Sequence, residues 1–286
     1  MPIMPVSRSH PSGRTMRILV VDVGGSHIKL LASGQRTRIR LPSGPTLTAA
    51  AMTAAVREAA KVWSYDVVSV GFPGPVHDGR PAAEPINLGK GWVDFDYAAA
   101  FDRPVHIIND AAMQALGGYR GGRMLFLGLG TGLGTALVIE GHLQPLELAH
   151  LPYRKGRTFE QYVGNAGLDR MGEDKWRRRV FDVVDRMVAA MQVPSLLIGG
   201  GNARLLKGHL DRLPPGTLLG TNDDAFRGGM RLWHAPSKLA RTALDDGVAA
   251  LDVDGDLVPE LATAGAPENA APAVPPVGSD VADETP

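Results

Sequence analysis

The sequence predicts an α/β protein built from two related halves that face a cleft. Three observations indicate this fold. Apolar runs typical of buried strands alternate with Ala-rich or amphipathic segments typical of helices. The same unit, an apolar strand followed by a glycine turn and a second strand, occurs at 20–30 and again at 125–138. The 286 residues are enough for one large or two modest hydrophobic cores.

The first half is expected over residues 16–112. The run RILVVD predicts a strand at 17–22 that is buried on both faces. Gly24 and Gly25 predict a turn into a second strand at 26–31. The later elements of this half are a helix at 46–64, strands at 67–70 and 104–110, a short helix at 93–102 and a helix at 111–119.

The second half is expected over residues 113–222. From Met124, the sequence MLFLGLGTGLGTALVIEGHLQPL predicts three strands joined by a glycine-rich turn and a tight Glu140-Gly141 turn. Helices are predicted at 158–171 and 173–192, then a strand, a glycine turn and a helix over 194–210, and a last helix at about 223–236 that returns to the first half. Residues 1–15 and the acidic, Ala- and Pro-rich stretch 237–286 have the composition of disordered segments.

Composition excludes several classes of protein. The chain is 44% hydrophobic and 21% charged, and its 30 basic and 30 acidic residues give no net charge, which argues against a nucleic-acid partner bound by bulk charge. Without cysteine it can hold no disulfide, thiolate nucleophile or cysteine-ligated zinc. No apolar run approaches the ~20 residues of a membrane span, and no signal peptide is recognised. We therefore expect a cytoplasmic protein with no membrane partner.

The glycine-rich turns do not match the common nucleotide motifs. The chain has no G-x-x-x-x-G-K-[ST] sequence. Counted from Gly128, the sixth position is Leu133, and counted from Gly130 it is Thr135, so the G-x-G-x-x-G spacing fails. A glycine hairpin without any ligand is a real alternative for either turn taken alone.

Two such turns, each after a buried strand, favour an anion site. Backbone N–H groups in a tight turn bind anions, and glycine lets the backbone approach phosphate oxygens closely. Hydroxyl groups and one lysine would assist, and a carboxylate at the strand end could hold Mg²⁺ through water. The candidate phosphate-binding residues are Asp22, Gly24, Gly25, Ser26, Lys29, Gly130, Thr131 and Gly132, with Asp22 as the indirect magnesium ligand.

Six motifs carry a resemblance to known kinases. DVGGSHIK and GLGTGLGTALVIEG resemble the two phosphate motifs of the actin-like sugar kinases, and IGGGNA resembles their adenosine motif, which assigns Gly200, Gly201 and Asn202 to the nucleotide. GFPGPV, INDAAMQALGGY and ELAH resemble the ROK family, within it the glucokinases and polyphosphate glucokinases. The resemblance covers about residues 17–234. It implies an actin-like, ribonuclease H-like fold of two lobes, each a mixed sheet flanked by helices, with a cleft between them.

The chain departs from the common ROK pattern in two places. Most ROK proteins carry a cysteine-rich zinc motif after the glutamate-to-histidine segment, and this chain has no cysteine. The polyphosphate glucokinase branch also lacks that motif, and INLGKGW resembles its corresponding loop, so no structural zinc is expected. In ELAH, Ala149 stands where glycine is common. Too few residues precede the first expected strand for the DNA-binding module of ROK repressors.

Asp110 is the candidate general base. Phosphoryl transfer to a hydroxyl needs in-line positioning, charge neutralisation and a proton acceptor. Asp110 stands where an apolar strand meets a helix, so the pattern alone favours a helix N-cap. The resemblance instead assigns the catalytic aspartate of the family to this position.

The sugar site is assigned mainly by the resemblance. It implies hydroxyl contacts from Glu147 and His150 of ELAH and from Glu160 of TFEQY. Asn109 offers a donor and an acceptor, while Gly74 and Asn87 would shape the pocket. The alternatives are an ordinary half-buried histidine at His150, a solvated helix face at Glu160, and a metal site at the Glu147/His150 pair.

The sequence thus predicts a magnesium-dependent enzyme of carbohydrate metabolism that phosphorylates the 6-hydroxyl of glucose from ATP or polyphosphate. A kinase for mannose, fructose or an N-acetylhexosamine, or a non-catalytic sugar-binding relative, remains an alternative. The family implies a homodimer. The runs YRKGR and WRRRV are ordinarily solvated faces, and they would be useful as a track if the donor is polyphosphate.

Overall fold

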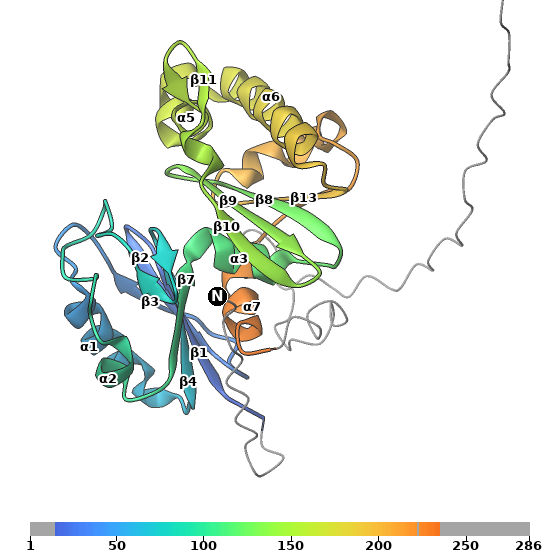
Figure 1. The fold of residues 1–286 in the computed structure, drawn as a ribbon. Helices are drawn as coiled ribbons and strands as arrows, with labels where there is room; N and C mark the ends of the chain where they lie inside the picture. Colours follow the sequence, from blue (N-terminus) through green and yellow to red (C-terminus); the bar gives the residue numbers. More distant parts are fainter. Residues whose placement is uncertain (1–14, 222, 235–286) are drawn as a thin grey trace, which may run out of the picture.

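Two five-stranded sheets form the framework of the protein, which we describe from a computed structural model covering residues 15–221 and 223–234 (Figure 1). The first sheet has the order β3-β2-β1-β4-β7 and contains β1 (Ile18–Val23), β2 (His27–Ala32), β3 (Ile39–Pro42), β4 (Val67–Phe72) and β7 (Val105–Asn109). The second has the order β10-β9-β8-β13-β14 and contains β8 (Arg123–Leu129), β9 (Leu133–Ile139), β10 (His142–Leu146), β13 (Ser195–Gly199) and β14 (Thr217–Leu219).

The two sheets repeat one topology. In each, three strands in chain order form antiparallel pairs, and two later strands add in parallel on the far side of the first. This confirms the predicted α/β class and the two related halves. The expectations for residues 1–14 and 237–286 lie outside the described residues.

Strand β1 is buried on both faces, and its side chains alternate between two cores. Leu19 and Val21 join the cluster under α1 (Ala49–Ala59) and α2 (Tyr97–Phe101). Val20 points to the opposite face, where it packs with Phe226 of α7 (Asp224–Arg231). The continuous apolar run of this strand is therefore explained by helices on both faces of the sheet.

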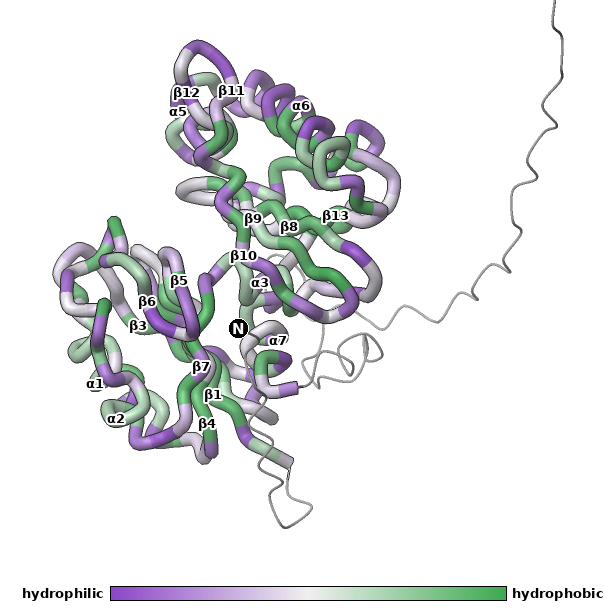
Figure 2. The backbone as a smooth tube through the Cα atoms, in the orientation of Figure 1, coloured by the Kyte–Doolittle hydropathy of each residue, from purple (hydrophilic) through white to green (hydrophobic). Residues whose placement is uncertain are grey.

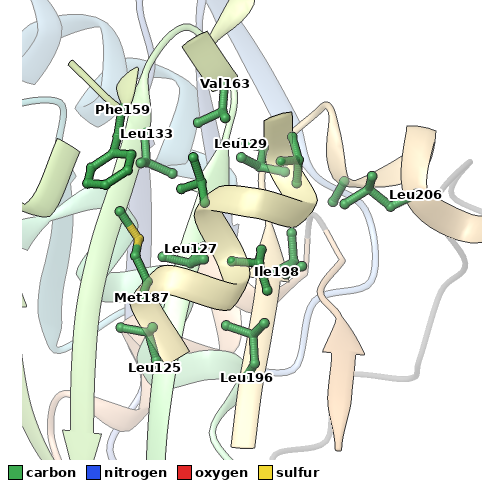
Figure 3. Close-up of a cluster of buried hydrophobic side chains, with 14 of the residues drawn as sticks. Leu125, Leu127, Leu129, Leu133, Phe159, Val163, Met187, Leu196, Ile198 and Leu206 are labelled. Atoms are coloured by element: carbon green, nitrogen blue, oxygen red, sulfur yellow. The ribbon is translucent and has the colours of Figure 1, made fainter. Parts of the chain in front are cut away.

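Strand β8 has the same relation to its own helices. Leu125, Leu127 and Leu129 pack with α6 (Glu173–Met191), and Figure 3 shows Met187 of that helix against them. Phe126 points the other way into the cluster that includes α3 (Asp110–Gly118). The rest of this half, over the described residues, contains α4 (Glu160–Val163), α5 (Asn165–Met171) and two 3-10 helices, η2 (Leu148–His150) and the longer η3 (Ala203–Arg212).

Helices α3 and α7 lie between the two sheets (Figure 1). They approach so closely that a Cβ atom on Gly117 would collide with the carbonyl oxygen of Asp224, and one on Gly228 with that of Met113. The hydroxyl of Ser69 donates to the carbonyl oxygen of Gly229 at 2.6 Å, which ties α7 to β4 of the first sheet. Helix α3 thus starts at the first sheet and packs on the second.

The differences from the predicted elements are local. The helix predicted after Gly201 is the 3-10 run η3, with non-helical angles at His209. The predicted helix 158–171 is divided at Gly164 into α4 and α5. Two short hairpins were not predicted, namely β5 (Val76–His77) with β6 (Arg80–Pro81) and β11 (Pro152–Arg154) with β12 (Arg157–Thr158). In the part of the chain that the structure describes, no helix has the length and apolar character needed to cross a bilayer.

Candidate active site

The first glycine turn follows β1 and is framed by an ion pair. Asp22 and Lys29 are opposite each other in the β1–β2 pair, and Lys29 Nζ lies 3.1 Å from Asp22 Oδ2. Asp22 is buried although it is charged. The N–H of Gly24 donates to the carbonyl oxygen of His27 at 3.0 Å, which closes the turn. The lysine therefore neutralises a carboxylate that a buried strand end would otherwise leave unpaired.

Asn87 lies beside this turn. A Cβ atom on Gly25 would be 3.3 Å from Asn87 Cβ, so the turn and the loop that carries Asn87 approach closely. Glu84 organises that loop, because its carboxylate accepts hydrogen bonds from the N–H groups of Gly91 and Trp92. The first turn and Asn87, predicted to serve phosphate and sugar respectively, are thus neighbours.

Asp110 is the first residue of α3, and Asn109 is the N-cap. Asn109 Oδ1 accepts from the N–H of Ala112 at 3.1 Å, and its Nδ2 donates to the carbonyl oxygen of Gly74 at 3.1 Å. Asp110 Oδ1 accepts from the N–H of Ala111 at 2.8 Å. The interpretation of Asp110 as the N-cap is therefore wrong, since the neighbouring asparagine has that role.

The environment of Asp110 changes its acidity. Burial raises the pKa of Asp110 from 3.8 to about 7, and the negative charge of Asp22 contributes to the increase. The N–H of Ala111 and the charge of Lys29 act in the opposite direction. Gly71 is opposite Asp22 in the β1–β4 pair, and a Cβ atom on it would be 3.6 Å from Asp110 Cα, so no side chain separates the two carboxylates there.

The second glycine turn joins β8 to β9 and reaches the start of α3. A Cβ atom on Gly134 would collide with that of Ala111, so β9 lies directly on the residue after Asp110. Glu160 Oε2 accepts from the N–H of Leu133 at 3.2 Å, and a Cβ atom on Gly132 would collide with the same oxygen. Glu160 is half-buried against this turn, so the alternative of a solvated helix face is wrong.

The third turn, after β13, is tied to the second. Gly200 has a φ of +82°, and the N–H of Asn202 donates to the carbonyl oxygen of Leu129 at 3.0 Å. Asn202 Nδ2 also donates to Asn165 Oδ1 at 2.8 Å, while the N–H of Asn165 donates to the carbonyl oxygen of Gly130 at 2.9 Å. Asn165 was not predicted, because nothing in the sequence distinguishes it from an ordinary helix start.

Among the described residues, no hydrogen bond or ion pair joins Glu147 or His150 to these turns. Their side chains are 64% and 68% exposed, with His150 Nε2 3.4 Å from Glu147 Oε2. The buried hydroxyl of Thr135 positions this segment by donating to the carbonyl oxygen of Leu146 and accepting from the N–H of Leu148. Among the described residues, no group of three or more His, Asp or Glu side chains is arranged to hold a metal ion.

The geometry brings most of the predicted residues to one region. Asp22, Lys29 and Asp110 interact directly through charge, and the second turn touches the first turn of α3. Backbone N–H groups, one cation and one carboxylate of raised pKa can together bind an anion and accept a proton.

Comparison with known sequences gives one family and several relatives. A profile of the ROK family matches residues 18–145. A polyphosphate glucokinase of Mycobacterium leprae is 31% identical over 210 residues, which are 63% of this chain and 62% of the relative. A polyphosphate glucokinase of Mycobacterium tuberculosis H37Rv is 28% identical over 225 residues, 70% of this chain and 83% of the relative. The chain thus spans 62% of the length of the Mycobacterium leprae protein.

Solved structures resemble the whole framework. The inorganic polyphosphate/ATP-glucomannokinase of an Arthrobacter species superposes with a TM-score of 0.62 and 23% identity, covering 79% of this chain and 99% of its own. A ROK family glucokinase of Streptomyces griseus, solved with glucose and AMPPNP, gives a TM-score of 0.61 at 16% identity, covering 76% of this chain and 98% of its own. At these identities the likeness is one of fold.

Proposed function

The chain belongs to the ROK family, and on this basis we propose that it transfers a phosphoryl group from polyphosphate or ATP to the 6-hydroxyl of glucose. The observation that carries the proposal is the placement of the Asp110 carboxylate at the start of α3, near Asp22 and Lys29, where burial raises its pKa to about 7. A general base works best when its pKa is near the working pH.

Asp110 would accept the proton of the sugar hydroxyl. Its Oδ1 is already held by the N–H of Ala111, which fixes the orientation of the carboxyl group. The attacking oxygen gains nucleophilicity as it loses its proton, and the loose transition state of phosphoryl transfer needs that proton to leave only late. The raised pKa makes Asp110 a stronger proton acceptor than an ordinary aspartate.

The glycine turns would hold the donor. Backbone N–H groups after β1 and β8, with the hydroxyls of Ser26 and Thr131, suit phosphate oxygens, and Lys29 would neutralise charge that develops in the transition state. If the donor is ATP, the turn of Gly200, Gly201 and Asn202 would receive its nucleoside. The hydrogen bonds that join Asn165 to Gly130 of the second turn and to Asn202 of the third support a shared role for these two turns.

A magnesium ion fits the charges present. Asp22 is buried and faces a second carboxylate, so a cation nearby would relieve the repulsion between them. Mg²⁺ prefers one or two carboxylates together with water and substrate phosphates, which matches Asp22 as an indirect ligand. When bound, the ion would neutralise charge on the donor phosphates.

The sugar would lie against Asn109 and Asp110, with Glu147, His150 and Glu160 supplying further hydroxyl contacts and Gly74 and Asn87 shaping the pocket. Asn109 Oδ1 and Nδ2 are each held by the backbone, which fixes the amide in one orientation. Glucose is the proposed acceptor because the curated relatives at 28–31% identity are polyphosphate glucokinases. A kinase for another hexose is the second candidate, and the name glucomannokinase of the Arthrobacter relative supports it.

The proposal is tested with purified protein, glucose and magnesium, comparing ATP and long-chain polyphosphate as donors and measuring glucose 6-phosphate. Mannose, fructose and N-acetylglucosamine are assayed in parallel as acceptors. Asp110→Asn should reduce turnover at least ~10³-fold while glucose binding, measured by calorimetry, is retained. Turnover that survives in Asp110→Asn would remove this residue from the role of base. No product from any donor and acceptor would favour the non-catalytic alternative.

A further inference from the structure

The second half contains a cavity of about 590 Å³ with a basic lining. It lies between the β11–β12 hairpin and helices α4, α5 and α6, and Tyr162 and Met171 form its less polar wall. Figure 2 shows the hairpin as a hydrophilic segment at the edge of this half. The five basic residues in the lining are Arg154, Lys155, Arg157, Arg170 and Arg179.

Most of this positive charge is not neutralised by the protein. Among the described residues, no carboxylate lies within ion-pair distance of Lys155, Arg157 or Arg179. Arg170 donates to the main-chain oxygens of Ala166 and Gln161. An ion pair forms between Arg154 and Asp182, and that carboxylate is shared with Arg186 and the Tyr153 hydroxyl. The cavity therefore concentrates several cations without a matching set of anions, which favours an anionic ligand.

The hairpin that carries these cations is held in place. Lys155 and Gly156 form its tight turn, with φ values of +49° and +71°. The ring of Tyr153 lies 5.1 Å from that of Phe159 and 4.9 Å from that of Tyr162, and its hydroxyl bonds Asp182 of α6. Lys155 and Arg157 thus project from a short, well-packed turn, and little backbone freedom is lost if they bind a ligand.

The cavity offers no surface for a base. Single-stranded nucleic acids and nucleosides are held largely by stacking on aromatic side chains. Tyr162 is the aromatic residue of the lining, and the guanidinium of Arg170 covers its ring at 5.4 Å. Arg154 covers the ring of Tyr153 at 5.2 Å in the same way. The lining suits an anion without aromatic rings.

Helix α4 connects the cavity to the second glycine turn. Glu160 at the start of this helix bonds the N–H of Leu133, and Tyr162, two residues later, lines the cavity. The helix is followed by Gly164 and Asn165, and the N–H of Asn165 donates to the carbonyl oxygen of Gly130. One short element therefore has the turn proposed to bind donor phosphates on one side and the basic cavity on the other.

We propose that this cavity binds the distal part of an inorganic polyphosphate chain whose reacting end lies at the glycine turns. This inference rests on the proposed function and deepens it by naming a linear, base-free polyphosphate as the preferred donor. The cations of the hairpin, α5 and α6 hold phosphates that are remote from the transferred group. Long chains reach the cavity, whereas ATP and tripolyphosphate do not.

The test neutralises the two exposed cations of the hairpin in the variant Lys155→Gln/Arg157→Gln. Binding of long-chain polyphosphate is measured by calorimetry without glucose, so that no turnover occurs. The expected result is about tenfold weaker binding, because two phosphate contacts of roughly 0.7 kcal/mol each are lost. With glucose, the KM for long-chain polyphosphate should rise by a similar factor, while kcat and the KM for ATP and tripolyphosphate stay unchanged.

The matched control is Arg36→Gln/Lys207→Gln, which removes the same charge from exposed positions outside the cavity. It should bind long-chain polyphosphate as the parent does, and the charge-preserving variant Lys155→Arg/Arg157→Lys should retain most of the affinity. Raising the salt concentration should weaken the parent more than the neutralised variant. Thermal melts establish that all variants fold.

The outcomes separate this inference from the proposed function. If polyphosphate phosphorylates glucose and the neutralised variant is unaffected, the cavity does not bind the donor. If an oligonucleotide displaces polyphosphate with equal affinity, the site is a general nucleic-acid surface and the inference is overturned. If no donor yields product but polyphosphate binding still depends on Lys155 and Arg157, the proposed function fails and the binding site stands.

Discussion

The charge of Asp22 raises the pKa of Asp110, although the two residues are on β1 and at the end of β7, with β4 between them. On β4, the residue that pairs with Asp22 is Gly71, and it lies against the start of α3. A side chain there would separate the carboxylates. Lys29, which is paired with Asp22, lowers the pKa of Asp110 by less than Asp22 raises it.

This coupling predicts the effect of Asp22→Asn on Asp110. The substitution removes a like charge, so the pKa of Asp110 should fall from about 7 toward the ordinary value of 3.8. Burial is the larger cause of the increase, so the decrease should be partial. The pKa is measured by NMR titration of carboxyl groups labelled with ¹³C.

Asp66→Asn is the control for that titration, because it removes one negative charge from a carboxylate that is paired with Arg17. It should leave the pKa of Asp110 within experimental error of the parent. An equal decrease in both variants would mean that overall charge, and not the neighbouring Asp22, sets the acidity of Asp110.

Burial of Asp110 also predicts that Asp110→Asn stabilises the protein at high pH. The folded pKa of about 7 is above the unfolded value of 3.8, so ionisation of this carboxyl group costs stability as the pH rises from about 4 to about 7. Asparagine carries no charge and keeps an oxygen for the N–H of Ala111. Above pH 7 the free energy of unfolding should increase by on the order of 3 kcal/mol, and near pH 4 the difference should disappear.

Urea denaturation at several pH values measures this effect. Asp169→Asn, at an exposed carboxylate of α5, is the matched control and should change the free energy of unfolding by less than ~0.5 kcal/mol at any pH. A constant effect of Asp110→Asn between pH 4 and pH 8 would show that the carboxyl group is not destabilised by burial.

The strong patterns of the sequence predicted the framework well. Strands that are buried on both faces, such as β1 and β8, produce long apolar runs, and the predicted tight turn at Glu140-Gly141 has φ values of +49° and +79°, of which glycine adopts the second readily. Strands β3 and β14 were not predicted, because they are short strands at sheet edges and their sequences have little apolar periodicity. The sequence pattern predicts a helix at η3, but it does not distinguish the 3-10 form from the α form.

Part of the candidate site could not have been predicted. Asp110 and Asn109 are adjacent and both favour N-caps, and only the backbone geometry assigns the cap to Asn109. The links that join the glycine turns, from Asn165 to Gly130 and to Asn202, connect segments far apart in the chain. Contacts of this kind depend on how the helices and loops of the second half pack.

The second glycine turn predicts very different effects on stability for two neighbouring substitutions. In Gly132→Ala the new Cβ atom would collide with Glu160 Oε2, whereas at Gly130 no atom lies within 4 Å of the added group. Gly132→Ala should lower the free energy of unfolding by about 1–3 kcal/mol, because Glu160 must leave the N–H of Leu133. Gly130→Ala should change it by less than ~0.5 kcal/mol.

Thermal and urea denaturation compare the two variants directly. If Glu160 is the colliding group, Gly132→Ala combined with Glu160→Ala should be less destabilised than the sum of the single changes predicts. Strict additivity of the two effects would indicate that Glu160 moves freely away from the turn.

The hydrogen bonds of Asn165, the first residue of α5, predict that the second and third glycine turns are coupled through this helix. Its side chain accepts from Asn202, and its N–H donates to Gly130, so it joins the second and third turns. Asn165→Ala leaves the buried amide of Asn202 without this partner and should cost about 1–2 kcal/mol of stability.

Under the proposed function, Asn165→Ala should also raise the KM for the phosphoryl donor severalfold, while the affinity for glucose is unchanged. Asn165→Asp keeps an acceptor for Asn202 and should retain most of the stability, which separates loss of this hydrogen bond from loss of the side chain. Donor KM, glucose titration and urea denaturation on the same three proteins measure these effects, and a donor KM that stays at the parent value in Asn165→Ala would mean that the two turns bind the donor independently.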